Sequence, residues 1–204
     1  MKKKIIITGG LGYIGTELCK LYSGVSWHHE IIVIDNRFIS ERVNQIRNWN
    51  MQFIQGDILD KNLMGKYCSD ADIVHHLAGV TQVPRTKSEA NDSQDKKIIE
   101  VAEQGTQNIL DVISKNCKII FPSTHVVYEG INEVKLDIKE NELTKPVLSY
   151  SSSKAINEKQ LKKSGKNYII LRLGSVYGYS TDSMRIDIMP NLFSKIASQE
   201  GTLK

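Results

Sequence analysis

The 204-residue sequence predicts an α/β protein built on an open, doubly wound parallel sheet. Short runs of isoleucine, valine and leucine alternate along the chain with longer amphipathic stretches. These runs are almost continuously apolar, which is typical of strands buried on both faces of a parallel sheet. A glycine-rich turn directly follows the first run, at the edge of the sheet where folds of this kind bind their ligands.

The first half of the chain contains three expected strand–helix pairs. They are expected at residues 4–8 and 13–22, 30–35 and 40–47, and 51–55 and 61–67. The first strand holds the run Ile5-Ile6-Ile7, and the second holds the four apolar residues 31–34. Both runs have the length of a buried strand rather than that of a membrane span.

The second half continues the alternation and then leaves it. Strands are expected at 73–76, 118–121 and 168–173, and helices at 94–115 and 149–163. In the first of these helices Ile98, Val101, Ile109 and Val112 recur at helical spacing. Strand, helix and strand in this order predict right-handed crossovers. After residue 174 come polar residues, Pro190 and one more helix-like stretch to about residue 198, which we interpret as the beginning of a second region.

Composition excludes several classes of protein. Hydrophobic residues at 40% and charged residues at 25% are close to globular averages, so a disordered or fibrous chain is excluded. No apolar run is long enough to span a membrane or to form a signal-peptide core. The net charge of +4 is too small to indicate a nucleic-acid partner. Cys19, Cys68 and Cys117 form no CxxC motif, which favours reduced thiols in a cytoplasmic protein, and no cluster has metal-ligand spacing.

The glycine-rich turn has the pattern GxxGxxG, formed by Gly9, Gly12 and Gly15. Such glycines permit a tight turn, a close approach of the backbone to a pyrophosphate, and close packing of helix on strand. The helix that follows offers free N–H groups and the positive end of its dipole to phosphates. The turn therefore predicts dinucleotide binding.

Asp35 ends the second strand, twenty residues after the turn. A carboxylate at this place can accept hydrogen bonds from the adenosine ribose and would repel a 2′-phosphate, which favours NAD over NADP. Arg37 is a counter-signal, because a guanidinium nearby could accommodate that phosphate. The alternative is a turn aspartate that binds no ligand.

Tyr150 and Lys154 are four residues apart on one face of an expected helix. A nearby ammonium group, like a positive nicotinamide ring, would lower the pKa of the phenol, so Tyr150 could exchange a proton with a sugar hydroxyl. Thr124, just after the fifth strand, would face the same crevice and could hydrogen-bond the same oxygen. The alternatives are that the Tyr–Lys spacing arises by chance, and that Ser123 and Thr124 only terminate the strand.

With these pieces in place, the chain resembles the extended short-chain dehydrogenase/reductase family, and within it the NAD-dependent nucleotide-sugar epimerase/dehydratase group. The matching stretches are TGGLGYIG, VIDN, GDILD, VHHLAG, GTQNIL, STHVVY, YSSSK and LRLGSVYG. They occur in the order and at the spacing of the family. The resemblance implies a Rossmann-type NAD-binding domain at 1–174 and the beginning of a smaller substrate-binding region at 175–204. Because family members commonly have roughly 300 residues, we expect the chain to be a fragment of a longer protein.

The resemblance also implies roles for individual residues. Thr124, Tyr150 and Lys154 would be catalytic. The cofactor would be bound by Gly9, Gly12, Tyr13, Ile14, Gly15, Asp35, Asn36, Asp57, Ile58, Leu77, Ala78, Gly79, Tyr150 and Lys154. The nucleotide diphosphate sugar would be contacted by Arg85, Thr124, His125, Ser175, Arg185 and Asn191. For the loop residues of this last set a purely structural role is the alternative, since surface loops carry such residues routinely.

Departures from the family pattern narrow the expected reaction. Sugar 4,6-dehydratases have Asp-Glu after the catalytic threonine, whereas this chain has His125 and Val126, and valine cannot transfer a proton. Glu129 follows the VY pair where the family usually has glycine. The resemblance implies a nucleotide-sugar epimerase acting at C4, with a decarboxylase, a keto-sugar reductase or a non-catalytic NAD-binding protein as alternatives. It also implies a homodimer formed through the helices at 94–115 and 149–163.

Overall fold

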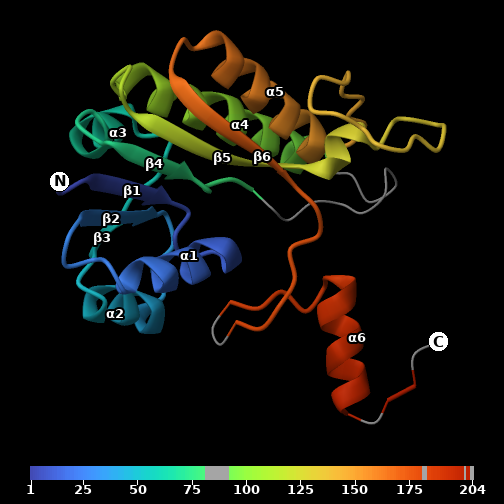
Figure 1. Ribbon diagram of the computed structural model, residues 1–204, viewed down its shortest axis with the longest axis horizontal. Helices are drawn as coiled ribbons and strands as arrows, with labels where there is room; N and C mark the ends of the chain where they lie inside the picture. Colours follow the sequence, from blue (N-terminus) through green and yellow to red (C-terminus); the bar gives the residue numbers. More distant parts are fainter. Residues whose placement is uncertain (81–91, 181–182, 200, 203–204) are drawn as a thin grey trace.

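The computed structural model describes residues 1–80, 92–180, 183–199 and 201–202. Six parallel strands form one sheet in the order β3-β2-β1-β4-β5-β6 (Figure 1). The strands are β1 (Lys4–Thr8), β2 (Glu30–Asp35), β3 (Gln52–Gln55), β4 (Ile73–His76), β5 (Lys118–Thr124) and β6 (Asn167–Leu173). The helices are α1 (Tyr13–Ser23), α2 (Ser40–Asn48), α3 (Lys61–Cys68), α4 (Asp92–Val112), the 3-10 helix η2 (His125–Tyr128), α5 (Ser149–Lys163) and α6 (Met189–Ser198). The predicted doubly wound parallel sheet is confirmed.

The helices cover the two faces of the sheet unequally (Figure 1). Helices α1 and α2 pack on the half of the sheet formed by β1, β2 and β3, where a cluster of apolar side chains includes Cys19, Val33 and Val43. Helices α3, α4 and α5 pack on the opposite face, around a second cluster that includes Ile109 and Phe121. These two clusters hold the strands rigidly, so the strand ends make a firm platform for a site.

The strand order reverses at β1, which pairs with β2 on one side and with β4 on the other. The chain leaves these two strands toward opposite faces, so a crevice opens beyond their carboxyl ends. Ligands of doubly wound sheets bind in such a crevice. The glycine-rich turn after β1 and the residues after β4 lie at this point.

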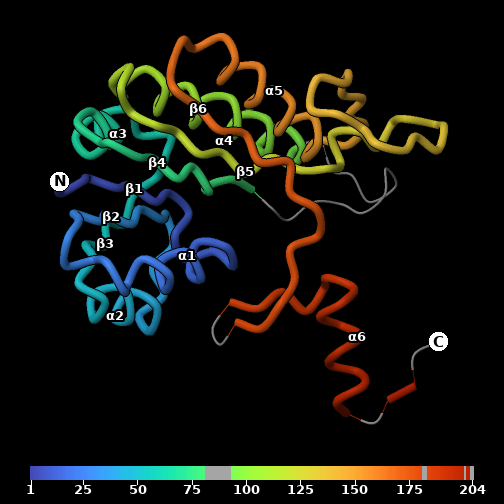
Figure 2. Tube along the Cα trace, viewed as in Figure 1, coloured from blue at the N-terminus to red at the C-terminus, as the bar shows by residue number. Residues whose placement is uncertain are grey.

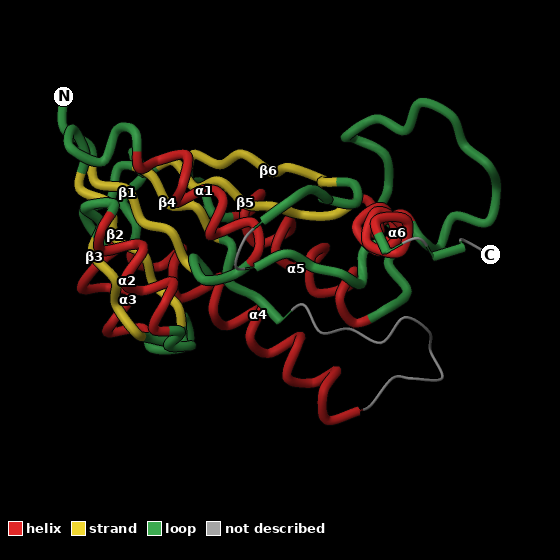
Figure 3. Tube along the Cα trace, turned by 90° about the horizontal axis from the view of Figure 1, so that it is seen from below, coloured by secondary structure: helices red, strands yellow, loops and turns green. Residues whose placement is uncertain are grey.

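The chain after β6 runs past the carboxyl ends of the strands to α6, which lies apart from the two helical layers (Figure 2). Figure 3, in which α6 is seen along its axis, shows it on the same side of the molecule as those strand ends. No helix in the described part of the chain is long and apolar enough to cross a membrane.

Three elements differ from the sequence prediction by more than one residue at an end, or in their burial. Strand β5 continues through Pro122 to Thr124, because beyond Ile120 it pairs with β6 alone, and an edge position tolerates proline. Helix α4 ends at Val112 rather than at residue 115, where the chain turns to enter β5. Strand β6 is not buried on both faces: Tyr168 and Leu171 are 38% and 42% exposed, since β6 has a strand on one side only.

Candidate active site

The turn between β1 and α1 depends on glycine at each motif position. Gly9 has φ +70°, and a Cβ there would lie 2.7 Å from the backbone nitrogen of Ala78. A Cβ on Gly15 would overlap the Gly9 carbonyl oxygen, so this glycine lets α1 pack closely on the turn. The sequence analysis did not assign Gly10, whose Cβ would overlap the Val33 side chain. The signal for Gly10 in the sequence was the presence of a fourth glycine in a turn that packs beside a strand of buried β-branched residues.

The first turn of α1 fits a dinucleotide phosphate group. Gly12 is the N-cap residue and has no side chain to cap the helix, so the N–H groups of the first turn remain available to a ligand. A Cβ on Gly12 would lie 3.2 Å from the Gly9 carbonyl and 4.0 Å from Arg37, filling the space that a pyrophosphate needs. Ile14, in the same turn, is 37% exposed.

Asp35 ends β2 with its carboxylate buried and fully hydrogen-bonded. Oδ2 accepts from the Leu11 N–H at 3.0 Å, and Oδ1 accepts from the N–H and Nε of Arg37 at 3.0 and 3.2 Å. Arg37 is thus an ion-pair partner of Asp35, and its side chain is 54% exposed. A ribose could reach Asp35 only if this mobile side chain turned outward.

The predicted adenine-side residues separate into a surface pair and a core residue. Asn36 Nδ2 donates to Asp57 Oδ2 at 3.0 Å, which joins the ends of β2 and β3 at the surface. Ile58, in contrast, is only 6% exposed and packs under Gly105 of α4. The side chain of Ile58 therefore belongs to the core, and the surface beside the adenine position is formed by Asn36 and Asp57.

A buried histidine organises the end of β4. The His76 ring is 3.0 Å from Thr8 Oγ1 through Nδ1 and 3.0 Å from Thr106 Oγ1 through Nε2. Burial lowers its pKa to about 3, with the Lys154 charge as a smaller cause, so the ring is neutral. Thr8 Oγ1 also accepts from the Ala78 N–H at 3.3 Å. The predicted cofactor residues after β4 are thereby fixed against the turn after β1, with Leu77 and Ala78 half-buried and Gly79 exposed.

Lys154 lies on α5 above the end of β5. Its Nζ donates to the Pro122 carbonyl at 2.9 Å and lies 4.6 Å from the centre of the Phe121 ring. Burial lowers its pKa to about 8. Nζ is 5.8 Å from the centre of the Tyr150 ring. The lysine thus lies beneath the tyrosine, as the four-residue spacing predicts.

Thr124 and Tyr150 lie where β5 meets α5, because α5 packs against both β5 and η2. Thr124 is 7% exposed, and its Oγ1 accepts from the Val126 N–H at 3.3 Å, which leaves the hydroxyl proton for another acceptor. The expected lowering of the Tyr150 pKa by Lys154 is wrong. Burial raises this pKa, and the cation that opposes the effect is Arg185.

Two carboxylates that sequence reasoning missed hold α5 in place. Glu129 Oε1 accepts from the N–H groups of Val147 and Leu148, each at 2.7 Å, and from the Ser151 hydroxyl. It therefore caps the start of α5, which accounts for an acidic residue where the family usually has glycine. Although burial raises the Glu129 pKa, these hydrogen bonds together lower it.

Glu158, the second carboxylate, is buried two turns further along α5. Its Oε1 accepts from Ser123 Oγ at 2.6 Å and from Arg172 Nε at 2.9 Å, and its Oε2 accepts from Arg172 Nη2 at 2.6 Å. Glu158 therefore joins α5 to both β5 and β6. Its position four residues after Lys154, on the same helix face, was the signal in the sequence.

The predicted substrate-side residues differ in burial and in their partners within the chain. His125 Nδ1 is 3.2 Å from the Leu173 carbonyl, and Ser175 is exposed. Arg185 pairs with Asp187, with its charge close enough to act on Tyr150. Asn191 is 3% exposed and bonded within the chain. The prediction for Arg85 lies outside the described residues.

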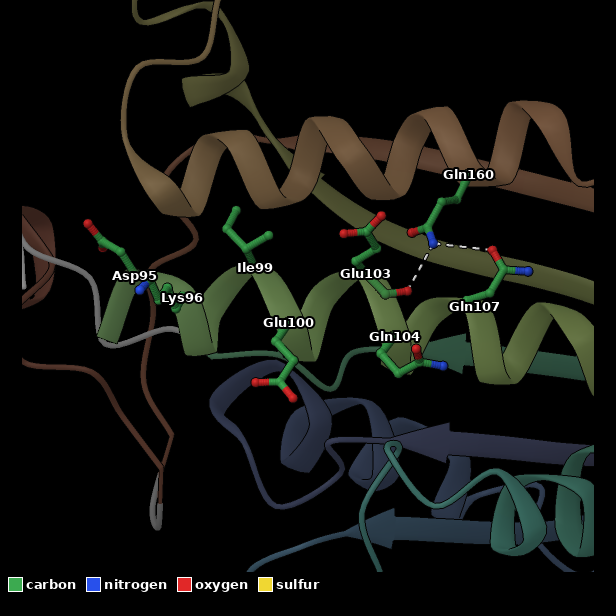
Figure 4. A pocket seen from close by; sticks show the side chains of 8 residues that line it. All are labelled: Asp95, Lys96, Ile99, Glu100, Glu103, Gln104, Gln107 and Gln160. Atoms are coloured by element: carbon green, nitrogen blue, oxygen red, sulfur yellow. Dashed lines mark hydrogen bonds between the residues drawn. The ribbon is translucent and has the colours of Figure 1, made fainter. Parts of the chain in front are cut away.

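A groove lies along α4, and its lining includes Gln160 of α5 (Figure 4). Gln160 of α5 spans it, donating to the Glu103 carbonyl at 2.9 Å and to Gln107 Oε1 at 3.3 Å. Its lining is mostly charged residues and amides of α4, with Ile99 as the apolar member. The groove is separate from the catalytic candidates.

A model of the NAD dependent epimerase/dehydratase family matches residues 5–204. UDP-N-acetyl-alpha-D-glucosaminuronate decarboxylase of Bacillus cytotoxicus is 35% identical over 130 residues, which are 63% of this chain and 38% of that protein. CDP-paratose 2-epimerase of Salmonella typhi is 33% identical over 153 residues, which are 69% of this chain and 42% of that protein. The chain thus matches less than half the length of either relative.

A solved structure agrees with the sequence matches. The UDP-glucuronic acid 4-epimerase of Bacillus cereus, in complex with UDP-glucuronic acid and NAD, superposes with a TM-score of 0.75 at 26% identity. The match covers 98% of this chain and 64% of that one. The predicted resemblance is confirmed: the chain belongs to the NAD dependent epimerase/dehydratase family.

Proposed function

We propose that the chain carries the NAD-binding and catalytic residues of a nucleotide-sugar epimerase that oxidises the sugar at C4 and reduces the keto intermediate on its other face. The observation that carries the proposal is the grouping of Thr124, Tyr150 and Lys154 where α5 packs on β5, with β4 between β5 and the strand that leads into the glycine-rich turn. A protein that only binds a dinucleotide has no need of this set. His125 and Val126 in place of two acids disfavour 4,6-dehydration.

NAD fits the first turn of α1, and its ribose would take the place of Arg37 at Asp35. When bound, NAD supplies a hydride acceptor and donor and a positive ring beside the phenol. A 2′-phosphate would meet the buried Asp35 carboxylate, which favours NAD over NADP.

Tyr150 acts as the base that removes the proton from the sugar hydroxyl and later returns it. Burial raises the pKa of the free phenol, so the base needs cationic neighbours to ionise near neutral pH. Arg185 is the cation of this chain that opposes this rise, while Lys154 Nζ lies 5.8 Å from the centre of the ring. Thr124 donates its hydroxyl proton to the sugar oxygen and holds it near Tyr150.

A decarboxylase of the same family is the second candidate function. The Arg185 charge beside Tyr150 suits an anionic sugar, and two of the matched proteins are named for uronic acid sugars. The two reactions share the first oxidation and differ in the product. Epimerisation leaves the mass of the nucleotide sugar unchanged, whereas decarboxylation loses carbon dioxide.

The test uses Tyr150→Phe, with Tyr168→Phe on the exposed edge strand as the matched control. We expect the loss of the phenol proton to lower turnover by about 10²–10⁴-fold while the affinity for NAD stays within about twofold. Nucleotide sugars, including uronic acids, are added with NAD, and the NADH absorbance band and the product mass are followed. Undiminished turnover in Tyr150→Phe contradicts the catalytic role. Saturable NAD binding with no product from any sugar favours the non-catalytic alternative.

We also propose that the chain forms a homodimer through α4 and α5. The outer sides of both helices are turned away from the sheet, and the groove between them is lined by Ile99 and by amide and charged side chains that a second copy could contact (Figure 4). This face is separate from the strand ends, so two copies could pair and leave both catalytic sites open.

A further inference from the structure

The segment between β6 and α6 is held against the start of α1, far from it in the sequence. Tyr13 is the first residue of α1, and its hydroxyl donates to the carbonyl of Gly178 at 2.6 Å. Gly178 has φ +135°, a conformation that favours glycine, so the chain bends at the residue to which the Tyr13 hydroxyl is hydrogen-bonded. The first turn of the dinucleotide-binding helix thus touches the predicted substrate-binding region directly.

Asn191, near the start of α6, holds the other side of the same bend. Its Oδ1 accepts from the Gly178 N–H at 2.9 Å, and its Nδ2 donates to the Arg185 carbonyl at 2.8 Å. Nδ2 is also 3.4 Å from the Tyr13 hydroxyl oxygen. The amide is buried and used on both ends, so it is not free to bind a nucleotide diphosphate as the sequence analysis expected.

The consequence of these bonds reaches the catalytic tyrosine. The Asn191 amide fixes the backbone of Arg185, and the guanidinium of Arg185 lies close enough to Tyr150 to affect its pKa. Tyr13 and Asn191 therefore fix Gly178 and the backbone of Arg185 relative to the start of α1. The Tyr13 hydroxyl makes the contact with Gly178, while the backbone N–H of Tyr13 belongs to the first turn of α1.

We infer that Tyr13 and Asn191 are positioning residues for the nucleotide sugar: together they clamp the chain at Gly178 and Arg185 against the start of α1. The kinetic consequence of this inference rests on the proposed function. The hydrogen bonds that form the clamp are independent of that function. The clamp uses the Tyr13 hydroxyl, whereas the first turn of α1 offers backbone N–H groups to NAD, so loss of the hydroxyl weakens the binding of the sugar and not that of the cofactor.

The kinetic test compares Tyr13→Phe with Tyr179→Phe, which removes the same hydroxyl one residue beyond the bend from a side chain that is 79% exposed. For Tyr13→Phe we expect KM for the nucleotide sugar to rise about five- to tenfold, the effect of one lost hydrogen bond. The expected change in the Kd of NAD is less than about twofold. An unchanged KM, or a KM and a Kd that rise together, overturns the inference.

A second measurement tests the clamp without turnover. The exchange of the Gly178 amide proton, which donates to Asn191, is followed by hydrogen–deuterium exchange in the 204-residue chain. We expect faster exchange at this amide in Tyr13→Phe and in Asn191→Ala, and no change in Tyr179→Phe or in the amides of β1. If no sugar reacts but this exchange rises, the proposed function fails and the clamp stands. If exchange is unchanged, the clamp is wrong whatever the turnover.

Discussion

The ammonium group of Lys154 is buried, where it is hydrogen-bonded to one carbonyl oxygen and lies over the faces of two aromatic rings. Burial lowers its pKa to about 8 in the folded chain, against about 10.4 for an exposed lysine. Between these two pH values the unfolded chain binds a proton that the folded chain does not. The free energy of unfolding therefore rises with pH across this window, as the cost of burying the ammonium disappears.

We expect Lys154→Met to abolish this part of the pH dependence. Between pH 8 and 10 the free energy of unfolding of the native chain should rise by about 2–3 kcal/mol more than that of Lys154→Met, as the size of the pKa shift requires. Urea unfolding at a series of pH values measures the difference. Lys159→Met, on an exposed position of the same helix, should keep the native pH dependence. Parallel curves for the native chain and Lys154→Met would contradict the buried charge.

The roles of single residues could be predicted from the sequence where those roles depend on residues close by in the chain. Gly9 and Asp35 could be identified because a glycine turn and a strand-ending carboxylate perform their roles through neighbouring residues. Glu129 could not, since its role depends on the chain returning eighteen residues later to place the Val147 N–H against it. The pKa of Tyr150 was predicted with the wrong sign, because burial depends on packing that the spacing does not reveal.

At the scale of elements, α5 is positioned by its buried side more than by its own helical preference. Four of its first five residues are serines, namely Ser149, Ser151, Ser152 and Ser153. Serine is a mediocre helix former. The helix is instead fixed at its start by Glu129 and along its length by the ion pair of Glu158 with Arg172. That ion pair connects α5 with β6, and Ser123 connects it with β5 next to Thr124.

We predict that Glu158→Gln destabilises the chain by about 3 kcal/mol, because it leaves the guanidinium of Arg172 without its buried counter-charge. Urea unfolding measures the loss. Glu133→Gln, on an exposed loop, should change stability by less than about 0.5 kcal/mol. In the double variant with Arg172→Met the two losses should not add, since both remove one interaction. Additive losses would show that Glu158 and Arg172 act independently.

Strand positions were predictable because burial on both faces selects continuous apolar sequence. Strands β1, β2 and β4 have the predicted bounds for this reason. The ends of β5 and α4 were not predictable, since they depend on which neighbour is present. At β6 the expectation of two buried faces failed, because the sequence does not reveal that this strand lies at the edge.

At the scale of the whole molecule, the reversal of strand order at β1 brings together residues that are far apart in the sequence. The turn after β1 and the residues after β4 lie side by side because β1 and β4 pair, and β5, which carries Thr124, is the next strand in the sheet. This gathering follows from the alternation of strands and helices, so the sequence predicted it. The placement of the residues after 174 was not predictable, because the hydrogen bonds of Tyr13 and Asn191 join positions 178 residues apart.

The proposed homodimer is the last property at this scale that can be tested. Ile99 on α4 and Ile156 on α5 are half-buried in the single chain, and on an outer helical face each can lose further exposed area only against another molecule. We expect the native chain to sediment with the mass of a dimer and the double variant Ile99→Asp, Ile156→Asp with that of a monomer, because two carboxylates would be buried unpaired at the interface. The affinity for NAD should stay within about twofold, since neither side chain lies near the turn after β1. Leu21→Asp, a change of the same kind on α1 at a position that is 78% exposed, should leave the dimer intact. A native monomer, or a double variant that remains dimeric, would place the interface elsewhere or nowhere.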